Sequence, residues 1–94
     1  MKLLCLTLDF HLPACRSLKE KRRRLNGLKD KFGSNPNIAV SESGFHDVHD
    51  RARWSFVIVG KSSRIIDAQK EQIQEYANSI IDGFITHCEA EYLL

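Results

Sequence analysis

Leucine or phenylalanine occupies every second position from Leu4 to Leu12. An alternation with this period places these side chains on one face of an extended segment, so a strand is predicted over residues 2–11. Pro13 ends the strand, because proline has no N–H to donate to a β ladder and favours extended geometry in the residue before it. The chain therefore begins with a strand that has one fully apolar face.

A helix is predicted next, from about Leu18 to Lys31. Ser17 and Glu20 have the spacing of a capping box, in which the serine side chain accepts a bond from a first-turn N–H and the glutamate reaches back. Residues 33–37 are turn formers and end the helix. Leu18, Leu25, Leu28 and Phe32 form an apolar stripe along this helix. The aliphatic stems of Lys21 and Arg22 fill the gap in the stripe between Leu18 and Leu25.

The remaining sequence predicts, in order, a strand at 38–42, a polar loop at 44–50, a strand at 51–60, a second helix, and a strand at 84–93. The second helix begins after Ser62 or Ser63, with Asp67 in its first turn. Gly83 is placed to cap the end of this helix. Apolar residues recur along it at three and four positions, namely Ile66, Ile73, Tyr76, Ala77, Ile80 and Phe84.

The order β-α-β-β-α-β predicts a ferredoxin-like fold of the α+β class. Two right-handed crossovers around a hairpin give a four-stranded antiparallel sheet of order 4-1-3-2, with both helices on one face. Residues 1–94 are enough for a single domain of this kind. We therefore expect one ferredoxin-like domain.

The composition is that of a soluble globular protein, with 43% hydrophobic and 28% charged residues. No apolar run approaches the roughly 18 residues that a membrane span needs, so no membrane partner is expected. The apolar start is interrupted by Asp9 and His11 and no cleavage site follows, which predicts a cytoplasmic protein rather than a secreted one. Three cysteines without a paired spacing predict neither a disulfide framework nor a zinc site.

Charge is concentrated in the predicted first helix. Residues 16–31 contain eight basic and two acidic side chains, a net charge of +6, while the rest of the chain carries six basic and ten acidic ones, a net −4. Such a face suits a polyanion, because each neutralised phosphate releases counterions; the alternative is an ordinary solvated helix face. The residues predicted to contact phosphates are Arg16, Ser17, Lys19, Lys21, Arg22, Arg23 and Arg24.

The sheet face away from the helices is expected to be unusually apolar. A sheet covered on one side normally shows polar residues on the other. Its two central strands also carry no aromatic residue on this face, whereas Trp54 and Phe56 belong to the core face, so an RNA-recognition module is not predicted. An interface between copies of the chain is therefore predicted on this face, at Leu3, Cys5, Val57 and Val59. The alternative is a sheet face that is apolar but has no partner.

The loop before the third strand carries His46, Asp47, His49 and Asp50. A loop does not preset ligand geometry and no cysteine joins the set, so no metal site is predicted. A structural role is favoured, with Asp47 paired to Arg51, and the loop candidates are His46, Asp47, His49 and Arg51. No catalytic group and no cofactor is predicted. Cys15 precedes a helix start beside Arg16, which favours thiolate, yet no His or acid lies at a fixed spacing to activate it.

Several short motifs resemble the YlxP-like family of small bacterial proteins, along essentially the whole chain. These are His11-Leu12-Pro13, the segment from Ser17 to Arg23, Asp47, and Arg51-Ala52. The resemblance implies a ferredoxin-like fold. Because some members are encoded among translation and ribosome-maturation factors, it also implies an RNA or ribosome context. The chain departs from the family at His49, where an aromatic residue is expected, and its basic run extends through Arg24.

The leading prediction is a non-enzymatic protein that contacts RNA or a ribosomal particle through its first helix. The alternative is a homo-oligomeric protein-interaction module that uses the open sheet face. A third class, a small enzyme or metal protein, would use the loop from His46 to Asp50.

Overall fold

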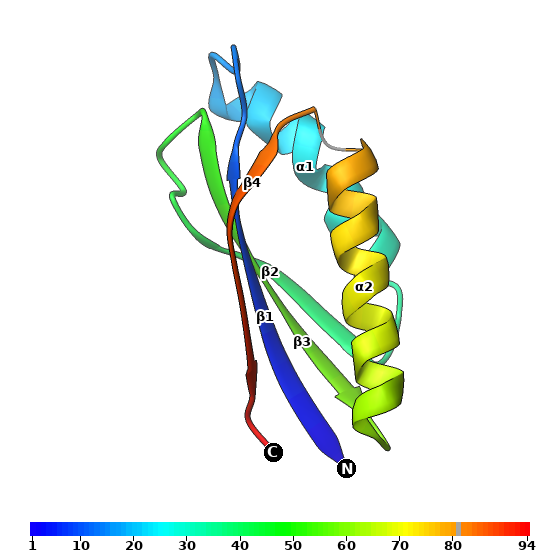
Figure 1. The fold of residues 1–94 in the computed structure, drawn as a ribbon. Coiled ribbons are helices and arrows are strands. Elements are labelled where there is room, and N and C mark those ends of the chain that lie inside the picture. Colours follow the sequence, from blue (N-terminus) through cyan, green and yellow to red (C-terminus); the bar gives the residue numbers. More distant parts are fainter. Residues whose placement is uncertain (81) are drawn as a thin grey trace.

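The computed structural model describes residues 1–80 and 82–94, with the side chain of Ile80 also outside the described part. Figure 1 shows a sheet with both helices on one face. Within the described residues the order of elements is the predicted one: β1 (Lys2–His11), α1 (Leu18–Phe32), β2 (Ile38–Gly44), β3 (Arg51–Gly60), α2 (Ser63–Ile80) and β4 (Phe84–Tyr92). The sheet order is β2-β3-β1-β4 and all pairs are antiparallel, which confirms the ferredoxin-like prediction.

The two central strands pair along their whole length, from Lys2 opposite Gly60 to His11 opposite Arg51. Because side chains alternate along a strand, this register fixes two faces. Trp54 and Phe56 lie on the helix face and are buried, as predicted. The buried core of the sheet consists of Leu4, Leu6, Leu8, Phe10, Ile38, Ala52, Trp54, Phe56 and Ile58.

Helix α1 begins with the predicted serine cap. Ser17 has extended backbone geometry and its Oγ accepts a 3.1 Å bond from the Glu20 N–H. The return bond differs from the prediction, since Glu20 accepts from the N–H of Arg16 at 3.0 Å rather than from Ser17. The predicted stripe also needs one correction: Arg22 is exposed, so Lys21 alone fills the gap before Leu25.

Helix α2 begins at the predicted serine cap but differs from the prediction at Asp67 and Gly83. Ser62 caps it, with Oγ accepting from the Ile65 N–H at 3.4 Å. Asp67 lies beyond the first turn and accepts a 3.1 Å bond from the Tyr92 hydroxyl. Gly83 does not have a left-handed backbone; a Cβ there would come within 2.6 Å of the His11 carbonyl oxygen, so close approach explains this glycine.

The prediction that Phe84 extends the apolar stripe of α2 is wrong. Phe84 is the first residue of β4, pairs with His11 and is 63% exposed. The helical spacing continues past the point at which the chain has already turned, near Gly83. Strand β4 as a whole lies at the edge of the sheet, and only Ile85 in it is half-buried. Among the described residues, no helix is long and apolar enough to cross a bilayer.

Candidate nucleic-acid interface

A group of cations is exposed to solvent around the start of helix α1, three of them on its first two turns and one just before its cap. Arg16, Lys19, Arg22 and Arg23 are all exposed. They follow one another around the start of the helix, where the positive end of the helix dipole adds to their charge. A shallow hollow there is lined by Ser17, Lys19, Glu20, Arg22, Arg23 and Asn26. We call the four exposed cations the α1 cation face.

The single carboxylate in this hollow is already engaged. Glu20 accepts the Arg16 N–H at 3.0 Å and the Arg24 guanidinium, also at 3.0 Å. The backbone bond from Arg16, followed by the Arg24 side chain, lowers the pKa of Glu20. Glu20 therefore stays ionised, and its direct ion pair is with Arg24 and not with a member of the α1 cation face.

Ser17 and Arg24 both have structural partners. The Ser17 hydroxyl is the helix cap. The Arg24 guanidinium donates to the carbonyls of Pro13 at 3.1 Å and Asp82 at 3.3 Å, besides its bond to Glu20. Arg24 thus fastens α1 to the chain before it and to the chain before β4. Both residues were predicted to contact phosphates, but in the structure their polar groups already bond to the protein itself.

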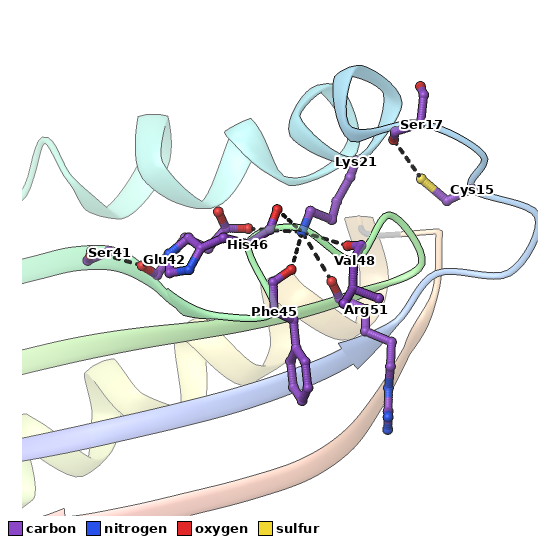
Figure 2. A network of polar contacts seen from close by, with 9 residues as sticks. All are labelled: Cys15, Ser17, Lys21, Ser41, Glu42, Phe45, His46, Val48 and Arg51. Carbon is purple, nitrogen blue, oxygen red and sulfur yellow. Dashed lines mark hydrogen bonds and ion pairs between the residues drawn. The ribbon is translucent and has the colours of Figure 1, made fainter.

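Lys21 is buried, with only 2% of it exposed. It was predicted to contact phosphates, and the structure does not present it to solvent for that. Its ammonium donates to the carbonyls of Phe45 and Val48 at 2.8 Å and of Arg51 at 3.2 Å, as Figure 2 shows. The His46 carbonyl lies at 3.5 Å, and the Glu42 carboxylate lies at the same distance. Lys21 therefore fastens α1 to the loop between β2 and β3. Its position, three residues after Leu18 and four before Leu25, was the sequence signal for burial.

The loop histidines do not converge on a shared site. A ring nitrogen of His46 lies 3.2 Å from the Glu42 carbonyl, and His49 Nδ1 lies 2.7 Å from the Cys15 carbonyl. Within residues 1–80 and 82–94, no group of three or more His, Cys, Asp or Glu side chains is arranged to hold a metal. The loop is thus fastened to its surroundings by its histidines.

The predicted pairing of Asp47 with Arg51 is absent from the described residues, and Asp47 is exposed. The Arg51 guanidinium lies instead over the Phe45 ring, 5.2 Å from its centroid. The Arg53 guanidinium lies over the same ring at 5.0 Å. Sequence reasoning gave Phe45 no role, because nothing local indicates that a loop ring meets two arginines on a neighbouring strand.

Arg53 also forms the main ion pair of the open sheet face. Its guanidinium donates to both oxygens of Asp9, at 2.8 and 3.1 Å. These bonds lower the pKa of Asp9 against the opposing effect of its burial, and they raise the pKa of Arg53. The charge of Arg53 is thus matched within the protein.

The four residues predicted to form an interface between copies lie together on the open face. Leu3 is directly opposite Val59 and Cys5 is opposite Val57, and all four are half-buried. The chain end extends this group, since the Leu93 N–H donates to the Leu3 carbonyl at 2.7 Å and Leu93 is 49% exposed. We call Leu3, Cys5, Val57 and Val59 the apolar patch.

The chain belongs to a family described as a protein of unknown function, DUF503, which matches residues 3–90. The family description carries no activity, and no curated protein matches the chain. The finer resemblance to YlxP-like proteins stays a prediction.

Solved structures similar to the chain share its fold at low sequence identity. One is the structural-genomics protein YJCS, 7% identical with a TM-score of 0.61, covering 95% of this chain and 96% of that one. A mutant of SnoaB, a cofactor-independent oxygenase from Streptomyces nogalater, is 8% identical with a TM-score of 0.60 over 100% and 93% of the two chains. A putative antibiotic biosynthesis monooxygenase from Chloroflexus aurantiacus is 11% identical with a TM-score of 0.57, over 98% and 93%. At such identities the likeness shows the fold alone.

Proposed function

We propose that this protein is a non-enzymatic accessory factor that contacts RNA, as free rRNA or in a ribosomal particle, through the α1 cation face. The observation that carries the proposal is the exposure of Lys19, Arg22 and Arg23 on one rigid helix, with Arg16 exposed directly before its N-cap. Cations fixed on one helix meet successive phosphates without the cost of ordering a flexible segment.

The distribution of charge supports the same surface. Residues 16–31 carry a net +6, and the rest of the chain carries a net −4. A polyanion is attracted to the positive region and repelled elsewhere, so the field of the molecule directs it to α1. The proposed set is narrower than the sequence suggested, because Lys21 and Arg24 bond to the protein itself.

Replacing Arg22 and Arg23 together by glutamine should weaken RNA binding without unfolding the protein, because both side chains are exposed. The slope of log affinity against log salt should fall by roughly 0.7–0.9 for each phosphate that the variant no longer neutralises. Fluorescence anisotropy with a labelled RNA, titrated at several salt concentrations, measures both quantities.

The matched control is Lys61→Gln with Arg64→Gln, which removes the same charge from exposed positions near the start of α2. Figure 1 shows that this end of the molecule is opposite the start of α1. The control should keep the salt slope of the unmodified protein. Equal weakening in both double variants, or no RNA binding at about 50 mM salt, would contradict the proposal.

A second candidate function, self-association, is favoured by the apolar patch. Leu3 and Val59 are opposed on the open face, with the exposed Leu93 beside them. Burying such a patch against a second copy removes apolar surface from water. Light scattering tests this candidate, and its outcome is argued below with the whole molecule.

A further inference from the structure

A row of aromatic and cationic side chains crosses the open sheet face at the end where β1 finishes. His11 pairs with Arg51 on one side and with Phe84 on the other. Directly opposed residues share a face of the sheet, so all three side chains lie on the face away from the helices. Phe45 completes the row, because its ring stacks against Arg51 at 5.2 Å. We call Phe45, Arg51, His11 and Phe84 the terminal row.

Two members of the terminal row are open to solvent. Phe84 is 63% exposed and Arg51 is exposed, while His11 and Phe45 are half-buried. A phenylalanine on an exposed edge strand gains little from the core, since its side chain faces away from the helices. Its flat ring is therefore available to stack on a planar partner.

Phe45 is held in place from the opposite side of the sheet. Its backbone is left-handed, with φ 57°, a conformation that bulky residues rarely adopt. Lys21 of α1 bonds the Phe45 carbonyl at 2.8 Å, and the ring lies over Arg51 and Arg53. Figure 2 shows the Phe45 ring and the Arg51 side chain both pointing away from Lys21. The ring is thus fixed before any partner binds.

The charge of the terminal row suits a phosphate chain. Arg53 is matched by Asp9, whereas Arg51 has no ion pair within the described residues. Aromatic rings beside a guanidinium without an ion pair are a combination by which proteins bind single-stranded nucleic acid, through base stacking and backbone charge. A duplex hides its base faces and could not use these rings.

The terminal row and the α1 cation face lie at the same end of the molecule. Residues 12–17 connect the end of β1 to the start of α1, and Figure 1 shows the start of β4 at this end too. The connection is fixed to the loop by two bonds, from Leu12 N–H to the Asp50 carbonyl at 2.8 Å and between His49 and the Cys15 carbonyl at 2.7 Å. A single strand that contacts both surfaces would pass around this end of the molecule, from the open sheet face to the start of α1.

We propose that the terminal row stacks the bases of unpaired nucleotides whose neighbouring phosphates contact α1, so that the ligand is single-stranded rather than duplex RNA. This inference rests on the proposed RNA contact of α1. It adds the form of the RNA and a second, base-contacting surface.

The test compares a structureless single-stranded 12-nucleotide RNA with a 12-base-pair RNA duplex. Phe84→Ala should weaken binding of the single strand by roughly 5- to 150-fold, the range for the removal of one base stack, and leave duplex binding unchanged. Phe84→Trp retains a ring and should keep the affinity. The fluorescence of the introduced indole should be quenched on binding, against the constant signal of the buried Trp54.

The outcomes separate this inference from the proposed function. If Phe84→Ala binds the single strand as the unmodified protein does, or the fluorescence of the Phe84→Trp variant is unchanged at saturation, the terminal row makes no base contact. Weakened binding in the Arg22→Gln, Arg23→Gln variant would then still support α1. Equal weakening for single strand and duplex would also overturn the stacking inference. If the unmodified protein binds neither RNA, both proposals are wrong.

Discussion

Lys21 is the residue whose environment most changes the interpretation of the basic segment. An ammonium group taken out of water is costly unless hydrogen bonds and an opposite charge replace its hydration. Here the carbonyls of Phe45, Val48 and Arg51 supply the bonds, and Glu42 supplies the charge at 3.5 Å. The carbonyls of this loop are not bonded in a helix or a β ladder, and Lys21 bonds them instead. These bonds fix the conformation of the segment before β3.

Replacing Lys21 by methionine keeps the aliphatic stem but removes every one of these bonds. The loop carbonyls and Glu42 would be left without their partner, so we expect the free energy of unfolding to fall by about 2 kcal/mol, within the roughly 1.5–3 kcal/mol of hydrogen bonds to a charged group. Urea unfolding followed by circular dichroism measures this change.

Lys19→Met is the matched control, because Lys19 is exposed on the same helix and its replacement should change stability by less than about 0.5 kcal/mol. RNA affinity should show the opposite pattern: it should fall for Lys19→Met and stay unchanged for Lys21→Met. A Lys21→Met protein with unchanged stability and weakened RNA binding would mean that Lys21 is a phosphate contact after all.

At the scale of elements, α1 combines two surfaces with separate tasks. One side carries Leu25, Leu28 and Phe32 into the core. The other presents the α1 cation face. Because both sides belong to one helix, the stability of the first turn determines how firmly the cations are held in place. Ser17 caps that turn, so it affects both the stability of the helix and the position of the cations.

Ser17→Ala should cost about 1 kcal/mol of stability, because the Glu20 N–H would no longer have its 3.1 Å acceptor. Ser63→Ala is a suitable control: Ser63 opens α2, yet the cap there is Ser62, so a change of a few tenths of a kcal/mol is expected. Thermal unfolding of the two variants compares them. A Ser17→Ala protein with an unaltered midpoint but reduced RNA affinity would identify Ser17 as an anion ligand rather than a cap.

Alternation and helical spacing were sufficient to predict the elements and the core, because both are set by residues close in sequence. The order of strands followed from the same elements and the handedness of crossovers. The bonds of Lys21 could not be predicted, because its partners lie 24 to 30 residues away and bond through carbonyls that every residue has. Phe84 was placed correctly at the start of the last strand but wrongly on the apolar stripe of the second helix, because a spacing of four residues fits a helix whether or not the helix continues.

At the scale of the whole molecule, the apolar patch and the RNA surfaces lie at opposite ends of the sheet. Leu3 and His11 are eight residues apart on β1, or about 26 Å at the rise of an extended strand. Pairing two copies through the patch would therefore leave the terminal row and the α1 cation face of each copy open. Self-association and RNA binding are compatible, and the first would strengthen the second by placing two cation faces in one particle.

Val57→Lys tests this arrangement, because Val57 lies within the apolar patch opposite Cys5 and a lysine there would be desolvated in any interface. Light scattering at micromolar concentration should give twice the chain mass of 10.8 kDa for the unmodified protein and the single mass for the variant. Ser41→Lys adds the same charge at an exposed position of the open face, so it should stay a dimer.

The added charge would by itself favour RNA, so the two lysine variants must be compared with each other. Val57→Lys should bind a long RNA more weakly than Ser41→Lys, because a monomer has only one cation face. Both should bind a short single strand equally, since one copy suffices for it. A single-chain mass for the unmodified protein would reject self-association through the patch. A dimer that survives Val57→Lys would instead have to form through another surface, such as the exposed edge strand β4.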